Sequence, residues 1–167
     1  IWMGNALFFG GTSWAQNKPQ PIYDVRRVSY TSEMQDQHVS ALCAAPDGTA
    51  WVGTSKYLYR FDGFGIERLD SMSPPFPVAQ LMLDTTAGDQ LIWACGPFGA
   101  KVFDLKTGHC LSEQEIGVSF ILSGNYTSIA KSTAGFYWLL CGEQLFRLTK
   151  TGAKRYRCQL FGAIPPC

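Results

Sequence analysis

The sequence predicts an all-β chain that forms a partial β-propeller, with three four-stranded antiparallel blades of a larger ring. Tryptophan recurs at Trp51, Trp93 and Trp138, with spacings of 42 and 45 residues. Fixed periods of about 20 to 50 residues are typical of propellers and other repeat proteins. Between the tryptophans lie short segments rich in β-branched and aromatic residues, separated by turn signals. No long window shows the apolar stripe of a helix.

The same residue types accompany each tryptophan. A glycine follows each one closely, and Asp62, Asp104 and Thr149 each lie eleven positions after their tryptophan. Because these residue types recur together, we interpret the period as a structural repeat with one tryptophan in each blade. The repeat positions are Trp51, Gly53, Asp62, Trp93, Gly96, Asp104, Trp138 and Gly142.

The first predicted blade spans residues 38–77. An apolar strand over residues 39–45 leads to an Asp-Gly turn at Asp47, and a second strand begins at Trp51. A third strand over residues 57–61 alternates large apolar with mixed residues, as half-buried strands do. The proline-rich end of this span is predicted to be a linker, since proline cannot donate a ladder hydrogen bond.

Residues 78–119 form the second predicted blade, and residues 120–167 form the third together with a linker to a missing blade. The second begins with a strand over residues 78–83, and residues 104–108 make a tight turn between its third and fourth strands. The third begins with a strand over residues 126–130, and its fourth strand is expected over residues 153–160. Three repeats are too few to close a ring, which usually needs about four to eight blades.

The N-terminal part is predicted to precede the blades. Residues 1–15 resemble the end of a truncated signal peptide, with small residues at Ser13 and Ala15 before a cut at Gln16. An exposed apolar arm or a first strand is the alternative. Residues 16–37 are expected to form a linker and an N-terminal strand over residues 23–30. We therefore interpret the chain as a piece of a longer protein.

The composition is that of a packed globular protein. Hydrophobic residues make up 46% of the chain and charged residues 16%, and the net charge is +1. These values argue against disorder. The near-neutral balance gives no electrostatic reason to expect nucleic-acid binding by this segment.

Candidate catalytic or metal-binding residues do not form a recognisable set. His38 and His109 are the only histidines and fall in different blades, and there is no Cys-x-x-Cys pair. The aspartates at Asp47, Asp62 and Asp104 are expected to cap turns. We predict no catalytic, cofactor-binding or metal residues and no cofactor, and the tryptophans are expected to pack between blades rather than stack on sugars.

Six cysteines lie at positions 43, 95, 110, 141, 158 and 167. Most are expected to be free and buried, as small apolar strand residues are. Cys95 and Cys141 fall at near-equivalent places after their blade tryptophans. In an exported protein one pair is a candidate disulfide, and Cys110 with Cys158 is the pair that we favour.

The stretch Trp51-Val52-Gly53-Thr54 followed by residues 58–63 resembles the two-component regulator propeller repeat. This family forms the periplasmic sensor region of hybrid two-component histidine kinases, common in Bacteroidetes. The resemblance implies a ligand-sensing segment that performs no catalysis itself. The full-length protein would be anchored in the inner membrane, form a homodimer and carry the kinase. An oligosaccharide or other small ligand from glycan breakdown would switch on polysaccharide-utilisation genes. The repeat motif fixes no ligand-binding residues, which therefore stay unknown.

Another part of the sequence resembles a different class of propeller. The stretch from Phe103 to Leu111 is similar to a turn of quinoprotein-like propellers, some of which are dehydrogenases, although Leu111-Ser112 stands where their docking tryptophan is expected. A propeller lyase or a pure scaffold is a further alternative. Enzymes of these kinds would need polar residues that converge in the central channel.

Overall fold

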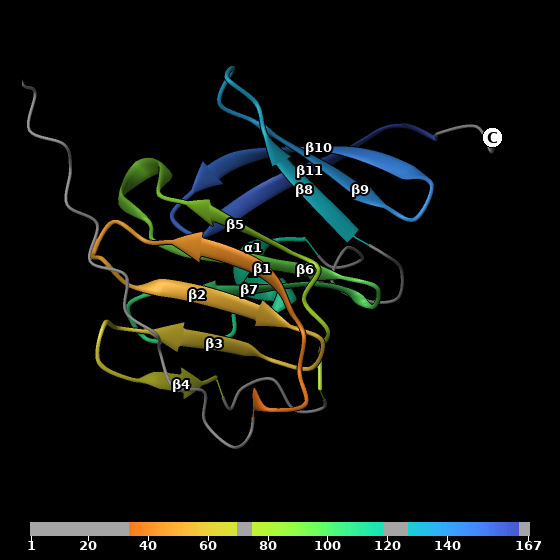
Figure 1. Cartoon of the computed structure of the whole chain (residues 1–167). Coiled ribbons are helices and arrows are strands. Elements are labelled where there is room, and N and C mark those ends of the chain that lie inside the picture. Colours follow the sequence, from red (N-terminus) through yellow and green to blue (C-terminus); the bar gives the residue numbers. More distant parts are fainter. Residues whose placement is uncertain (1–33, 70–74, 119–126, 164–167) are drawn as a thin grey trace, which may run out of the picture.

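A computed structural model describes residues 34–69, 75–118 and 127–163, which form three antiparallel sheets (Figure 1). In each sheet the strands pair in the order in which they occur along the chain. The first sheet contains β1 (Val39–Ala44), β2 (Ala50–Thr54), β3 (Leu58–Phe61) and β4 (Ile66–Arg68). The second contains β5 (Gln80–Asp84), β6 (Leu91–Gly96) and β7 (Gly99–Asp104). The third contains β8 (Thr127–Lys131), β9 (Tyr137–Cys141), β10 (Gln144–Gly152) and β11 (Arg155–Ala163).

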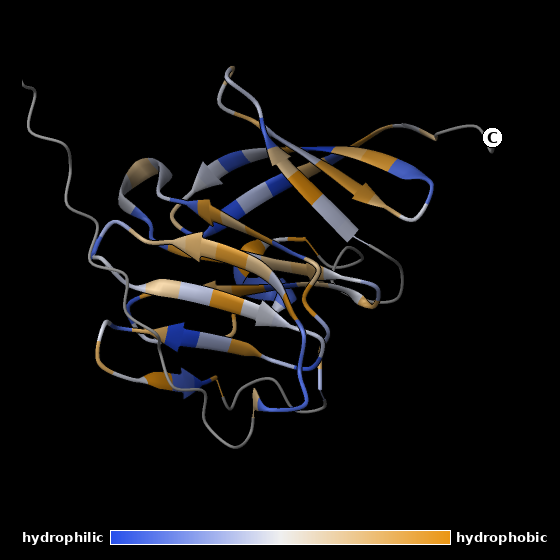
Figure 2. Ribbon diagram, in the orientation of Figure 1, coloured by the Kyte–Doolittle hydropathy of each residue, from blue (hydrophilic) through white to orange (hydrophobic). Residues whose placement is uncertain are grey.

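The three sheets pack face to face in chain order, as the blades of a propeller do. Their first strands lie next to one another, since β1 contacts β5 and β5 contacts β8. The strands contain many apolar residues (Figure 2), and two hydrophobic cores lie between the sheets. One core lies between the first and second sheets around Trp51, and the other lies between the second and third sheets around Trp93. The chain is thus an all-β partial propeller.

The second sheet has three strands, not the four that the sequence predicted. The expected fourth strand is reduced to one isolated bridge between Phe103 and Cys110. The chain then leaves the sheet at Ser112, which caps the short helix α1 (Glu113–Ile116). Ser112 Oγ accepts a hydrogen bond from the Glu115 N–H, and the Glu115 side chain accepts one from the Ser112 N–H. This capping box satisfies backbone donors that a strand would have used in a ladder.

The glycines after the first two tryptophans allow the linker between the first two sheets to approach closely. A Cβ atom added to Gly53 would lie 2.6 Å from Val78 Cγ1, and one added to Gly96 would lie 2.0 Å from the Pro77 carbonyl oxygen. Ser40 donates a hydrogen bond to the Val78 carbonyl at the same crossing. Glycine is therefore required there by contact with the crossing backbone.

Replacing Gly96 by alanine should destabilise the fold, because the new methyl group meets backbone that cannot rotate away. We expect a loss of about 1–3 kcal/mol in the free energy of unfolding, as for other overpacked sites. Urea unfolding followed by tryptophan fluorescence measures it. Gly65→Ala is the matched control, since a Cβ there meets nothing within 4 Å. Equal stability of the two variants would contradict the crossing argument.

Candidate functional site

Each sheet directs its repeat tryptophan toward the sheet that follows. Trp51 is 1% exposed in the core shared with the second sheet, and Trp93 is 0% exposed in the core shared with the third. On β9, Tyr137 and Leu139 belong to the core that faces the second sheet. Because side chains alternate along a strand, Trp138 lies on the opposite face. The tryptophans therefore keep one orientation through all three sheets.

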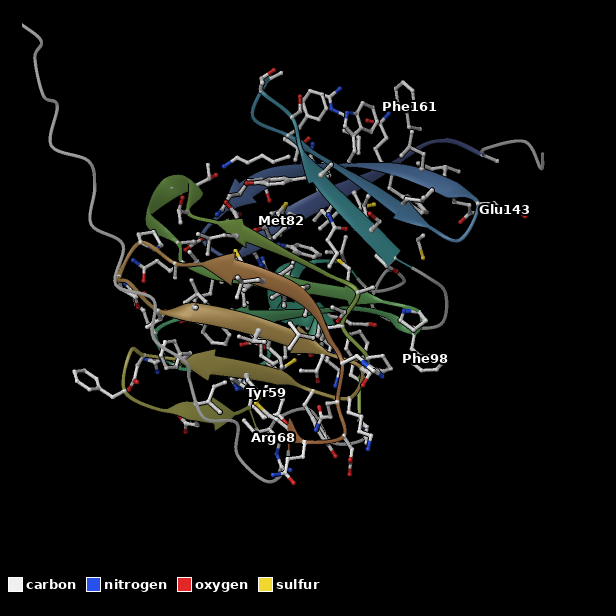
Figure 3. All side chains as sticks on the ribbon, viewed as in Figure 1. Tyr59, Arg68, Met82, Phe98, Glu143 and Phe161 are labelled. Atoms are coloured by element: carbon white, nitrogen blue, oxygen red, sulfur yellow. The ribbon has the colours of Figure 1, made fainter. Side chains whose placement is uncertain are left out.

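Trp138 differs from the other two because no described sheet covers its face. It makes edge-to-face contacts with Phe136 and Phe161, at ring-centroid distances of 5.2 and 4.9 Å. The guanidinium of Arg147 lies 4.5 Å from the Phe136 ring centroid. Phe161 is 65% exposed and points away from the other sheets (Figure 3). We call Phe136, Trp138 and Phe161 the outer aromatic cluster.

Charged side chains join the second and third sheets at the end of β5. Asp84 is fully buried and forms an ion pair of 3.0 Å with Lys150, which also pairs with Asp89 at 2.9 Å. The hydroxyls of Tyr137 and Tyr156 both donate hydrogen bonds to the Asp84 carboxylate. We call this cluster the Asp84 network.

The hydrogen bonds of the Asp84 network keep its carboxylate ionised. Burial alone would raise the pKa of Asp84, but hydrogen bonds from Tyr156, Tyr137 and the Thr86 N–H outweigh it and hold this pKa far below the usual range. Burial and the hydrogen bond to Asp84 raise the pKa of Tyr137 to about 12. Because Asp84 belongs to the second sheet and Tyr137, Tyr156 and Lys150 belong to the third, the network holds these two sheets together.

The repeat aspartates cap turns, as their positions in the sequence suggested. Asp62 Oδ1 accepts hydrogen bonds from the Phe64 and Gly65 N–H groups, both at 2.9 Å. Asp104 Oδ1 accepts one of 2.8 Å from the Lys106 N–H. Asp104 also forms an ion pair with Lys154, and in the described part of the chain no second carboxylate is a partner of Asp62 or Asp104, as general acid–base catalysis would need.

The two histidines are surface residues of different sheets. His38 is exposed, and His109 is exposed beside Glu115 with an N–O distance of 3.8 Å. Among residues 34–69, 75–118 and 127–163, no three histidine, cysteine or acidic side chains are grouped so as to hold a metal ion.

The favoured disulfide is absent from the structure. Cys110 and Cys158 are both free thiols, and they belong to different sheets. Burial raises the pKa of Cys95 to about 12. It is also the main reason why the pKa of Cys158 is raised to about 11, so both side chains remain protonated thiols at neutral pH. Cys167, the predicted signal peptide over residues 1–15 and the N-terminal strand over 23–30 lie outside the described residues.

A charged cleft opens between the outer strands of the first sheet and the turn that follows β7. Its volume is about 260 Å³. The first sheet contributes Arg60 from β3, Glu67 and Arg68 from β4, and Trp51 from β2. From the other side come the residues of the turn, 106–108. We call this the first inter-sheet cleft.

The missing fourth strand of the second sheet explains why this cleft exists. The bridge between Phe103 and Cys110 corresponds to the pair between Leu148 and Cys158 in the third sheet. Gly108 in the second sheet and Tyr156 in the third each lie two positions before the cysteine, so these two residues are equivalent. Tyr156 fills its interface by an edge-to-face contact with Trp93 at 5.2 Å. Gly108 has no side chain to fill the equivalent position, and it lines the cleft instead.

Sequence reasoning found neither the Asp84 network nor the cleft. Asp84 lies 53 positions from Tyr137 and 72 positions from Tyr156, with Lys150 at a separation between these two. Separations of this size leave no local motif. One signal was present for the cleft: Ser112-x-x-Glu115 is a capping-box pattern, and it marks where the second sheet loses its fourth strand.

Comparison with known proteins identifies one family repeat and several distantly similar solved structures. Residues 33–56 match the family model of the two-component regulator propeller. No curated protein matches the chain. YCF48 bound to D1 peptide is similar at 15% identity and a TM-score of 0.45, over 72% of this chain and 39% of that one. The extracellular domain of a putative hybrid two-component system from B. thetaiotaomicron is similar at 16% identity and a TM-score of 0.37, over 80% of this chain and 24% of that one. This chain therefore spans well under half the length of either structure.

Proposed function

We propose that this chain, which carries a two-component regulator propeller repeat over residues 33–56, is the extracytoplasmic ligand-sensing segment of a hybrid two-component sensor. It binds an oligosaccharide or other small ligand released by glycan breakdown and regulates polysaccharide-utilisation genes through a kinase elsewhere in the protein. The repeat match is the observation that carries this proposal. The segment itself performs no catalysis.

The packing of the sheets supports a sensing role. Neighbouring sheets are joined by polar contacts near their edges as well as by apolar cores, as in the Asp84 network between the second and third sheets. Gln80 at the start of β5 likewise donates a hydrogen bond of 2.7 Å to the Ile129 carbonyl of β8. A ligand that binds between sheets would shift these contacts if it binds one packing arrangement of the sheets more tightly than another. The shift in population is set by this difference in affinity.

The proposed partners follow from the faces of the sheets. The outer aromatic cluster repeats the orientation of Trp51 and Trp93, which are both covered by a following sheet. We assign this face to a further propeller blade of the same protein, and the complete sensor is proposed to be a periplasmic homodimer held in the inner membrane. Among the described residues no helix has the length and apolar character needed to cross a membrane.

Ligand binding by the purified chain tests the proposal. Enzymatic digests of plant and host polysaccharides are added, and thermal unfolding is compared with that in the undigested polymers. A ligand present at about 100 times its Kd stabilises the folded state by about 2.7 kcal/mol. For a chain of this size that corresponds to a rise in Tm of roughly 5–10 °C. An unchanged Tm with every digest, neutral and acidic, would overturn the sensing role.

A further inference from the structure

We propose that the first sheet is a hinged unit of the propeller. It is attached to the second sheet at one end and swings at the other, where the first inter-sheet cleft lies, whereas the second and third sheets move as one body. This inference deepens the proposed function, because it names the interface that a bound ligand would move. Its test uses no ligand, so its failure and the failure of the proposed function can be told apart.

The turns of the antiparallel sheets alternate between two ends. β1, β5 and β8 run in the same direction (Figure 1). We call the end at which they begin the linker end, since residues 75–79 cross there from the first sheet to the second. We call the end at which they finish the Asp84 end, since Asp84 is the last residue of β5. Because the strands alternate in direction, the turns after β3, β7 and β10 also lie at the Asp84 end.

The third sheet is attached to the second at both ends. Near the linker end, Gln80 Nε2 donates a hydrogen bond of 2.7 Å to the Ile129 carbonyl, and Gln80 Oε1 accepts one of 3.0 Å from the Ile129 N–H. At the Asp84 end, Asp84 pairs with Lys150 and accepts hydrogen bonds from two tyrosines of the third sheet. Hydrogen bonds and ion pairs require a narrow range of distance and direction. Attachments at both ends therefore oppose rotation of one sheet against the other.

The turn between β10 and β11 adds a further attachment at the Asp84 end. Lys154 in this turn has φ 56, a left-handed conformation that residues other than glycine rarely adopt. Its N–H donates a hydrogen bond of 2.6 Å to Asp89 Oδ2, and its ammonium group forms an ion pair with Asp104. Asp89 precedes β6 and Asp104 ends β7. Both the main chain and the side chain of Lys154 thus fix the turn to the second sheet.

The first sheet is attached to the second by backbone hydrogen bonds at the linker end. The Val78 N–H donates a hydrogen bond of 2.9 Å to the Thr54 carbonyl, and the Phe76 N–H donates one of 2.7 Å to the Lys56 carbonyl. Ser40 Oγ donates a hydrogen bond to the Val78 carbonyl at the same crossing. These bonds surround the linker, so they can hold the two sheets together while the opposite end moves.

The Asp84 end of this interface has no comparable attachment. The turn aspartates Asp47 and Asp62 accept hydrogen bonds from their own turns. Between the described residues of the first and second sheets there is no ion pair. The Cys43 thiol meets the Leu83 N–H there, and sulfur is a weak acceptor. The remaining contacts are those of the apolar core around Trp51, which have no directional preference.

The two interfaces also differ in how they are filled at the Asp84 end. Tyr156 packs against Trp93 between the second and third sheets. Gly108, at the equivalent position, has no side chain and lines the first inter-sheet cleft, whose volume is about 260 Å³. The first and third sheets each pack on the second through one face, so the number of neighbouring sheets does not explain the difference. A swing of the first sheet about the linker end changes the width of this cleft and keeps the backbone bonds of the linker, as hinge motions do.

Pulsed electron paramagnetic resonance on the purified chain tests the hinge. Pairs of a ketone-bearing amino acid are introduced and coupled to nitroxide labels, which leaves the native thiols unlabelled. Positions 64 and 106 report on the first and second sheets at the Asp84 end, and positions 106 and 134 report on the second and third. Phe64, Lys106 and Ala134 are all exposed. The distance distribution between positions 64 and 106 should be at least about twice as wide as that between 106 and 134.

Two further pairs are controls for this measurement. Positions 55 and 98 join the first and second sheets at the linker end, where Phe98 lies in the turn between β6 and β7 (Figure 3). Their distribution should be as narrow as that between 106 and 134. Positions 55 and 64 lie within the first sheet, so their distribution measures the motion of the label at Phe64 itself. It should also be narrow.

A variant of the Asp84 network shows whether its bonds fix the third sheet. Asp84→Asn keeps the size of the side chain and removes its charge, so it should widen the distribution between positions 106 and 134 by about half or more. Asp47→Asn is the matched control, because Asp47 bonds within its own turn, and it should leave this distribution unchanged. If Asp84→Asn does not fold, Lys154→Gln tests the same attachment through a side chain that is 44% exposed.

The outcomes separate the hinge from the sensing role. A wide distribution between positions 64 and 106 beside three narrow ones, together with widening of the 106 and 134 pair in Asp84→Asn alone, establishes the hinge. Equal widths for the 64 and 106 pair and the 106 and 134 pair overturn it, and so does equal behaviour of Asp84→Asn and Asp47→Asn. Neither result changes the Tm measured with polysaccharide digests, which tests the sensing role by itself.

Discussion

Replacing Trp93 by alanine is expected to lower the free energy of unfolding by about 3–5 kcal/mol, the cost of emptying a large aromatic site in a core. The side chain is completely buried between the second and third sheets and makes an edge-to-face contact with Tyr156. Small domains are stable by only about 5–15 kcal/mol. The loss is therefore a large fraction of the total, and urea unfolding measured by circular dichroism will report it.

Trp138→Ala is the control for this prediction. Trp138 occupies the corresponding place on the third sheet, but it is only partly buried and no described sheet packs over it. We expect its replacement to cost less than about 1.5 kcal/mol. If Trp93→Ala prevents folding, Trp93→Phe keeps most of the ring and gives a measurable intermediate loss. Equal costs at the two tryptophans would refute the one-directional packing of the sheets.

Removal of the Asp84 carboxylate is the second change with a large expected effect. Asp84→Ala removes one ion-pair partner of Lys150, which is nearly buried, and it removes the acceptor of the Tyr137 and Tyr156 hydroxyls. Breaking a buried ion pair by removing one partner typically costs about 3–5 kcal/mol. We expect the lower end of this range, because Asp89 still pairs with Lys150 at 2.9 Å. Asp62→Ala, at an exposed turn, should cost less than about 1 kcal/mol.

The pH dependence of the same variant identifies the cause. Hydrogen bonds outweigh burial and lower the pKa of Asp84 in the folded state, so its contribution to stability is present above the pKa of an unfolded aspartate, about 3.9. That contribution is lost as the pH falls below this value toward the folded pKa. The stability difference between the native chain and Asp84→Ala should therefore be full at pH 7 and smaller at pH 3. A difference that is the same at both pH values would show that charge is not responsible.

Most of the strands could be predicted because each carries its own pattern. The predicted strands over residues 39–45 and 57–61 correspond to β1 and β3 within about a residue at either end. The strand expected over residues 153–160 appears as β11 (Arg155–Ala163). Turn residues set the ends of these strands. Asp47 and Asp62 accept hydrogen bonds from the backbone of their own turns, and these bonds do not depend on how the sheets pack.

The missing fourth strand of the second sheet shows where repeat reasoning fails. The period implied a strand after residues 104–108, and the turn does form there, with Gly108 at φ +69. A local signal then overrides the period, because the Ser112 and Glu115 capping box starts a helix within four residues. The repeat pattern describes an average blade, whereas this short motif determines that the second blade continues into a helix and not into a fourth strand.

The candidate site could not be predicted because its parts come from different sheets. Arg60 and Lys106 are 46 positions apart and meet only after the first two sheets have packed. Nothing near either residue in the sequence marks it as more than a solvated surface charge. Trp51 lies in the core between these sheets, and no neighbouring residue in the sequence indicates that its N–H lacks an acceptor.

The common direction of the tryptophans makes each interface between sheets heterologous: one face always meets the opposite face of its neighbour. Such contacts have a donor end and an acceptor end, and they produce a ring if the rotation closes and an open filament if it does not. The outer aromatic cluster is the donor end. The acceptor end is the opposite face of the first sheet, where Leu42 is 69% exposed while Met34 already packs against Val52 and Tyr59. At high concentration the isolated chain is therefore set up for head-to-tail polymerisation, and a single charge at Trp138 should block the growth of such filaments.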